Sequence, residues 1–71
     1  MKYPIFKIMA RERGLKFTRS VRLWSEWSGM FYGTVDHVED HIAVHFPKCE
    51  LLLGIFTQEE DNGPWYFVKS Y

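Results

Sequence analysis

The sequence has one cysteine, Cys49, in 71 residues. A single thiol excludes an internal disulfide framework and is typical of a reducing compartment, so we expect a cytoplasmic protein. No segment approaches the roughly 20 consecutive apolar residues that a transmembrane helix needs. The N-terminus also lacks the small-residue cleavage site of a signal peptide. These absences predict a soluble protein with no membrane partner.

The chain also lacks the motifs of common catalytic sites. It contains no glycine-rich phosphate loop, its serines lie in no nucleophile elbow, and no histidine is placed as a base for Cys49. Neighbouring carboxylates at 39–40 and 59–61 fall in predicted turns, where acidic groups are usually solvated. We therefore expect neither an enzyme nor a bound cofactor.

Hydrophobic residues make up 46% of the chain and aromatic residues 18%, which is too apolar for a disordered protein. The length predicts one small domain, residues 1–71, with one core. The net charge is zero, but its distribution is uneven. Residues 2–22 carry seven basic side chains and one acidic side chain, whereas residues 26–61 carry eight acidic and one basic. This division predicts either an electrostatic binding surface or internal charge pairing.

Pro4 and Gly14 enclose a segment that has the form of a short helix, at about 4–13, with an edge strand as the alternative. Alternating apolar and polar residues then predict a first strand. A cluster of turn formers follows at 25–29, and the clearest loop of the chain is at 59–64. The predicted strands are at about 15–24, 30–38, 41–46, 51–57 and 65–70.

The three histidines and the cysteine recur at intervals of four residues: His37, His41, His45 and Cys49. A helix would place all four on one face, whereas a hairpin would scatter them. The segment is rich in β-branched residues and histidine, which are weak helix formers, so we expect a hairpin with its turn at 39–40. His41 and His45 would then lie about 13 Å apart at about 3.3 Å per residue. This is too far for one zinc ion, so no metal site is expected.

Five short strands predict a mainly β fold: a small five-stranded SH3-like barrel, or a bent antiparallel sheet, with a short N-terminal helix. The segment 27–46 carries an aromatic pair, a small residue, a valine, a turn and an alternating valine–phenylalanine strand. In this order of residues it resembles the central hairpin of SH3-like and Tudor-type barrels. The resemblance implies a binding module and names no ligand.

The chain has more large aromatic residues than one small core can hide, and such residues are enriched at interface hot spots. We expect Trp24, Trp27 and Tyr32 to form an exposed patch, with an acidic loop beside Trp65. The predicted function is a non-enzymatic protein-binding module that acts as an adaptor or inhibitor of a larger protein, as some small proteins of viruses and mobile elements do. The predicted partner-binding residues are Trp24, Trp27, Tyr32, Trp65, Glu59, Glu60 and Asp61.

The alternative is an RNA- or DNA-binding domain in which basic residues contact phosphates and aromatic side chains stack on bases. The acidic residues weigh against it, because nucleic-acid-binding domains are usually basic overall. An exposed edge strand would also allow two copies to form a homodimer. The residues of the nucleic-acid alternative are Lys7, Arg11, Arg13, Lys16, Arg19 and Arg22.

Overall fold

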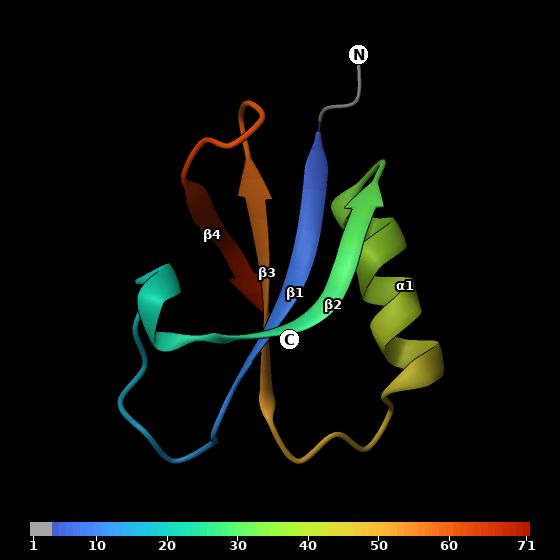
Figure 1. Ribbon diagram of the computed structural model, residues 1–71. Helices are drawn as coiled ribbons and strands as arrows, with labels where there is room; N and C mark the ends of the chain where they lie inside the picture. Colours follow the sequence, from blue (N-terminus) through green and yellow to red (C-terminus); the bar gives the residue numbers. More distant parts are fainter. Residues whose placement is uncertain (1–3) are drawn as a thin grey trace.

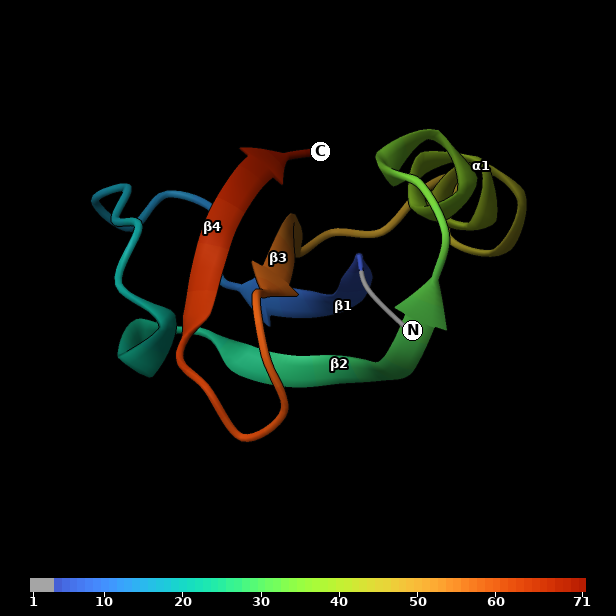
Figure 2. The same ribbon diagram turned by 90° about the horizontal axis from the view of Figure 1, so that it is seen from above.

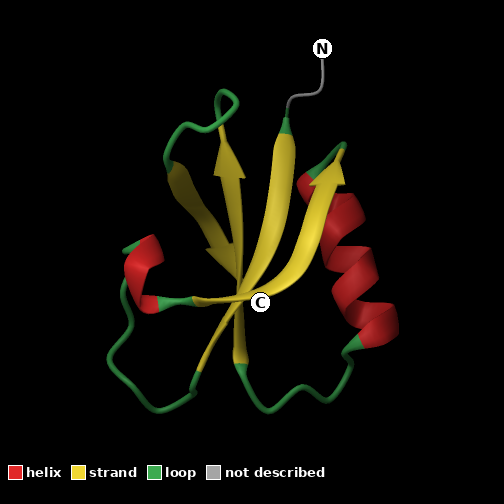
Figure 3. Ribbon diagram, in the orientation of Figure 1, coloured by secondary structure: helices red, strands yellow, loops and turns green. Residues whose placement is uncertain are grey.

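A computed structural model describes residues 4–71 as an antiparallel four-stranded sheet with one α-helix (Figures 1 and 3). The strand order is β2-β1-β3-β4, so the first strand of the chain lies inside the sheet. In chain order the elements are β1 (Ile5–Arg11), the 3₁₀ helix η1 (Val21–Leu23), β2 (Ser25–Tyr32), α1 (Val35–His45), β3 (Leu52–Gln58) and β4 (Trp65–Ser70).

Helix α1 covers one face of the sheet and forms the main core with it (Figure 2). Alternate residues of β1 and β3 point to this face because successive side chains of a strand alternate between its two sides. The helix contributes Val38 and Ile42, both fully buried. The buried residues of this core are Phe6, Ile8, Ala10, Val38, Ile42, Leu53 and Ile55.

The second face of the sheet is covered over part of its area by the segment 12–24, which lies on the opposite side of the sheet from α1 (Figure 1). Trp24 is 5% exposed and packs with Met9 and Phe56 in a smaller core. Gly54 leaves room for its indole ring, since a Cβ atom at this position would lie 2.9 Å from two ring atoms of Trp24. The remainder of this face, beside β2 and the β3–β4 loop, is open.

The helix predicted at 4–13 is wrong, because these residues contain β1. Residues 5–10 of this strand are all buried, since β1 has neighbours on both edges and covering layers on both faces over much of its length. A strand buried on both faces shows a continuous apolar run, and periodicity cannot distinguish such a run from a helix. Pro4 comes directly before the strand, where the missing N–H is tolerated.

The strand predicted at 15–24 is also wrong, because only η1 has regular structure there. Local hydrogen bonds replace ladder pairing, as is common for threonine and serine. The backbone N–H of Ser20 donates to Thr18 Oγ1 at 3.1 Å, and Trp24 Nε1 donates to the Thr18 carbonyl oxygen at 3.1 Å. Two of the alternating apolar residues that predicted this strand, Leu15 and Leu23, are more than half exposed.

The hairpin predicted from strands 30–38 and 41–46 is wrong, because 35–45 form α1. Strand β2 begins at Ser25, inside the predicted turn, and ends before Gly33, whose φ of 132° suits glycine. Thr34 then caps the helix, its Oγ1 accepting from the backbone N–H of His37 at 3.2 Å. The cap and the burial of Val38 and Ile42 outweigh the weak helix propensity of this segment.

The last two predicted strands are confirmed with shifts of at most one residue, as β3 and β4. The predicted mainly β character and antiparallel sheet are confirmed as well. The described residues form four strands in an open sheet and not a five-stranded barrel, since the segment 27–46 supplies one strand and the helix. Within residues 4–71, no helix has the length and apolar character that crossing a bilayer would require.

Candidate binding pocket on the open face of the sheet

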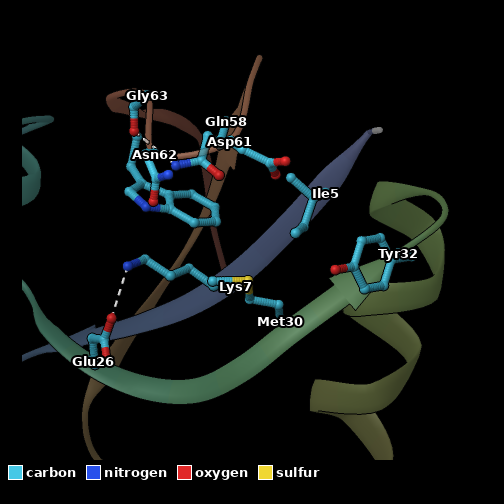
Figure 4. Close-up of a pocket in the computed structure, with 10 residues that line it drawn as sticks. Ile5, Lys7, Glu26, Met30, Tyr32, Gln58, Asp61, Asn62 and Gly63 are labelled. Carbon is cyan, nitrogen blue, oxygen red and sulfur yellow. Dashed lines mark hydrogen bonds and ion pairs between the residues drawn. The ribbon is translucent and has the colours of Figure 1, made fainter. Parts of the chain in front are cut away.

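The open part of the second face contains a pocket of about 490 Å³ between β2 and the β3–β4 loop (Figure 4). We call it the Trp65 pocket. Strand β1 lies between these two walls and supplies Ile5 and Lys7. The residues that line the pocket are Ile5, Lys7, Glu26, Met30, Tyr32, Gln58, Asp61, Asn62, Gly63 and Trp65.

Strand register brings these side chains together. On one side of β1, Ile5 is paired with Tyr32 and Lys7 with Met30. Residues paired directly across an antiparallel ladder project from the same face, so all four belong to the open face. On the other side, Gln58 is paired with Ile5 and also with Trp65 across β3 and β4.

Lys7 is a lysine whose side chain is only 9% exposed, although it lies in the open half of the sheet face. Its Nζ donates to Glu26 Oε1 at 2.8 Å and lies 4.3 Å from the centroid of the Trp65 ring (Figure 4). The carboxylate and the aromatic ring both stabilise the ammonium charge. Its aliphatic stem meanwhile fills space in the floor of the pocket.

Glu26 is the solvent-facing partner of this pair, with 71% of its side chain exposed. The hydrogen bond from Lys7 and the positive charge of Lys7 lower the pKa of Glu26, and desolvation opposes them only weakly. The carboxylate is therefore ionised at neutral pH. The pocket has the Lys7–Glu26 charge pair at one end, whereas Met30, Tyr32 and the Asp61 carboxylate lie away from that pair (Figure 4).

The β3–β4 loop forms the opposite wall, and its shape is fixed by hydrogen bonds. Gln58 Nε2 donates to the Gly63 carbonyl oxygen at 2.7 Å, and the Gly63 N–H donates to the Glu60 carbonyl oxygen at 3.1 Å. Asn62 has a φ of 61°, a left-handed conformation that asparagine tolerates better than most residues. Asp61 and Asn62 line the pocket, while Glu59 and Glu60 are exposed on the same loop.

The structure brings together Tyr32, Trp65 and Asp61 of the predicted partner-binding residues. Tyr32 is 55% exposed, as expected for a patch residue. The predicted exposure of Trp24 is wrong, because it belongs to the small core beneath 12–24. Trp27 is 37% exposed but lies on the helix side of the sheet, where its ring centroid is 5.6 Å from that of Phe46.

The six basic residues of the nucleic-acid alternative lie on β1 and on the segment 12–24 and differ in their contacts. Lys7 is engaged in the Trp65 pocket, and Arg11 Nη1 donates to the Leu23 carbonyl oxygen at 3.0 Å. The guanidinium of Arg19 lies 5.9 Å from the Phe67 ring centroid. Lys2, counted in the basic segment, lies outside the described residues. Four of the six are exposed on the segment 12–24: Arg13, Lys16, Arg19 and Arg22.

Sequence reasoning missed Glu26 and Met30, which face the pocket from β2. It assigned 25–29 to a turn, so Glu26 was not placed on a strand. Met30, the first residue of the strand predicted at 30–38, was not named as a binding residue. The sequence predicted a role for Lys7 only in contacts with phosphates. One signal was present: Lys7 is the single charged residue in a row of apolar residues from Ile5 to Ala10, and a lysine in such a row needs a partner.

The histidines follow the helical alternative and share one stripe of α1, so the hairpin argument against a metal site no longer holds. Partial burial lowers the pKa of His41 first, and the charges of His45 and His37 lower it further. Within residues 4–71, no three side chains from histidine, cysteine, aspartate and glutamate are grouped closely enough to hold a metal ion.

The Trp65 pocket combines two exposed large side chains, Met30 and Tyr32, with an ordered acidic loop. One side of the pocket is formed by β2, an edge strand of the sheet. Comparison of the chain with protein-family models, with curated proteins and with solved structures found no match in any of the three.

Proposed function

We propose that the protein is a non-enzymatic protein-binding module, an adaptor or inhibitor, whose contact surface is the Trp65 pocket and its rim. The observation that carries the proposal is the half-covered second face of the sheet, where large side chains are exposed around a pocket. The resemblance to SH3-like and Tudor-type barrels implied a binding module, and the proposal keeps that implication while relying on the open sheet.

The rim has the composition of an interface hot spot. Met30 and Tyr32 are 57% and 55% exposed, and both lie on β2, an edge strand of the sheet. Aromatic residues and methionine are enriched in the cores of interfaces. Tyrosine buries a large rigid ring, and the flexible methionine side chain adapts its shape to the partner. A partner side chain placed between them would bury apolar surface that is now in contact with water.

The charge around the pocket selects the chemistry of the partner. Glu59 and Glu60 are exposed on the loop beside Trp65, and Asp61 lines the pocket. We expect an apolar anchor residue flanked by lysine or arginine, because opposite charges at an interface rim accelerate association and exclude wrong partners. In such a complex, the aromatic part of the surface would contact the apolar anchor, and the acidic loop would contact the basic residues beside it.

The test is capture of a partner by immobilised protein, using variants that change the surface but leave the core intact. Met30→Glu and Tyr32→Ala alter the rim, and Val44→Glu is the matched control, because Val44 is 72% exposed on α1. A captured protein should be retained by the wild type and by Val44→Glu and be lost with Met30→Glu. With the purified partner, Tyr32→Ala should weaken binding by about 2 kcal/mol, a factor of about 30 in Kd.

Two outcomes would contradict the proposal. One is equal loss of the captured protein with Val44→Glu, which would indicate a different surface. The other is release of the captured protein by nuclease treatment, which would indicate that nucleic acid bridges the two. Partner binding through Met30 and Tyr32 should also persist between about 50 and 200 mM salt, because apolar contacts depend little on screening.

The second candidate function is nucleic-acid binding by the segment 12–24. The observation that favours it is that Arg13, Lys16 and Arg22 are exposed there and, within residues 4–71, form no ion pair. Three free cations on one segment can neutralise phosphates. Phe17, 48% exposed on the same segment, would offer a ring for base stacking.

Fluorescence anisotropy with a labelled single-stranded oligonucleotide tests this candidate. Binding should fall steeply between about 50 and 200 mM salt and be abolished by Arg13→Glu with Arg22→Glu. Met30→Glu should leave it unchanged. No binding by the wild type at 50 mM salt would remove the candidate.

A further inference from the structure

The histidine stripe of α1 lies on the helix side of the molecule, away from the Trp65 pocket. The imidazole rings of His41 and His45 approach each other, with centroids 4.4 Å apart and planes inclined by 37°. These residues are four positions apart in a helix, and such residues are surface neighbours. They are the closest pair of titratable rings in residues 4–71.

The ring separation limits the geometry of an ion that both rings bind when each ring directs a nitrogen toward that ion. An ion about 2.1 Å from a ring nitrogen lies about 3.2 Å from that ring's centroid. Two centroids 4.4 Å apart then correspond to a nitrogen–metal–nitrogen angle of about 90°. That angle matches neighbouring ligands of a square-planar or octahedral ion and is narrower than the tetrahedral angle of zinc.

His41 is held in place by aromatic neighbours, so little ordering remains for an ion to impose. Its ring centroid is 4.8 Å from that of Phe31 on β2 and 5.8 Å from that of Phe46 at the end of α1. His45 is exposed, and its ring is 6.3 Å from that of Phe46. One ligand is therefore fixed by packing, and the other is free to adjust its side-chain torsions.

We propose that His41 and His45 form a two-histidine chelate for one divalent transition-metal ion of tetragonal or octahedral preference, Ni²⁺ or Cu²⁺. Imidazole nitrogen suits both ions. With no third histidine, cysteine or carboxylate grouped with the pair in the described chain, the other coordination positions face solvent and take water. The site is thus open to an additional ligand from outside this chain.

His37 supplies a matched control because it is four residues from His41 on the other side. It is exposed on α1, and within the described chain its ring makes no close aromatic contact of the kind that joins His41 to His45. A nonspecific affinity of helical histidines for metal would involve His37 as much as His45. The proposed site pairs His41 with His45 and does not include His37.

Titration with Ni²⁺ alone, followed by calorimetry and by paramagnetic broadening of histidine ring signals, tests the site. Ni²⁺ is preferred to Cu²⁺ as the probe because Cu²⁺ can oxidise the thiol of Cys49. One ion per chain should bind, with early broadening of the His41 and His45 signals. His45→Ala should weaken binding at least about tenfold, whereas His37→Ala should change it by less than about twofold.

His41→Ala removes a packed ring and could disturb the fold, so its circular dichroism spectrum is compared with that of the wild type. His45→Ala is the main test because His45 is exposed. Equal weakening by His37→Ala and His45→Ala would overturn the proposal. So would a wild-type affinity no greater than that of His45→Ala. Binding of Zn²⁺ as tight as that of Ni²⁺ would contradict the inferred geometry.

Discussion

The two faces of the sheet differ in what covers them, although the same strands supply both. On the α1 face, Ile8 and Ile55 are fully buried against Ile42 of the helix. On the second face, the neighbouring residues of β1 and β2 include a charged lysine, Lys7, and the exposed Met30. Alternation along a strand thus separates the residues that hold the fold from those available for contact.

The largest difference between the faces is expected in stability. Ile42→Ala should lower the free energy of unfolding by about 2–5 kcal/mol, because it removes buried methyl groups and leaves a cavity. Met30→Ala on the open face should change it by less than about 0.5 kcal/mol. Urea denaturation of both variants measures the contrast. Equal losses would mean that the open face is as tightly packed as the helix face.

A second pair of substitutions compares the part of the second face that the segment 12–24 covers with the part that is open. Gly54→Ala should cost about 1–3 kcal/mol by overpacking, since its Cβ would lie 2.9 Å from the Trp24 ring. Gly29→Ala is the matched control on β2, where a Cβ would meet no atom within 4 Å. Tryptophan fluorescence should shift for Gly54→Ala alone. An unchanged fluorescence spectrum and an unchanged free energy of unfolding would show that the segment 12–24 shifts to make room for the methyl group without loss of stability.

The smallest expected effect concerns the charge pair of the pocket. Lys7→Met keeps the buried stem and removes the ammonium, so the pKa of Glu26 should rise from its lowered position toward its ordinary value. An NMR titration of the Glu26 side chain measures the change. Because the folded-state pKa is lowered, the pair stabilises the wild type above the ordinary carboxyl pKa, and this contribution disappears as pH falls. If the pKa of Glu26 is the same in Lys7→Met as in the wild type, Lys7 is not the cause of its lowering.

The C-terminal half of the sheet could be predicted from sequence because its signals are local. The turn formers at 59–64 separate β3 from β4. The pattern of each strand's own residues predicts that strand correctly, without information about the neighbouring strands. The covering helix could not be distinguished from a hairpin by pattern, because Val35, Ile42 and Phe46 share one apolar face in both arrangements. Val38 joins them at helical spacing, and Val44 joins them in the hairpin. Composition favoured the hairpin. The helix forms because Thr34 caps its N-terminus and because Val38 and Ile42 are buried against the sheet.

The pocket was predictable only in part. Tyr32, Trp65 and Asp61 were selected as surface residues by type and by position near a loop. The meeting of Lys7 with Glu26 depends on the pairing of β1 with β2, which contains an irregularity between Lys7 and Met9. A bulge shifts which residues face each other, and no local pattern in this sequence indicated its position.

The interior position of β1 has a consequence for synthesis. This strand leaves the ribosome before the other strands of the sheet, yet its pairing with β3 joins residues such as Ile5 and Gln58, more than fifty positions apart. A nascent chain that has completed β2 can form only one of the two ladders of β1, so the other edge stays unpaired until β3 emerges. Unpaired edges invite association between chains. The second ladder of β1 can therefore form during synthesis only after β3 (Leu52–Gln58) has emerged.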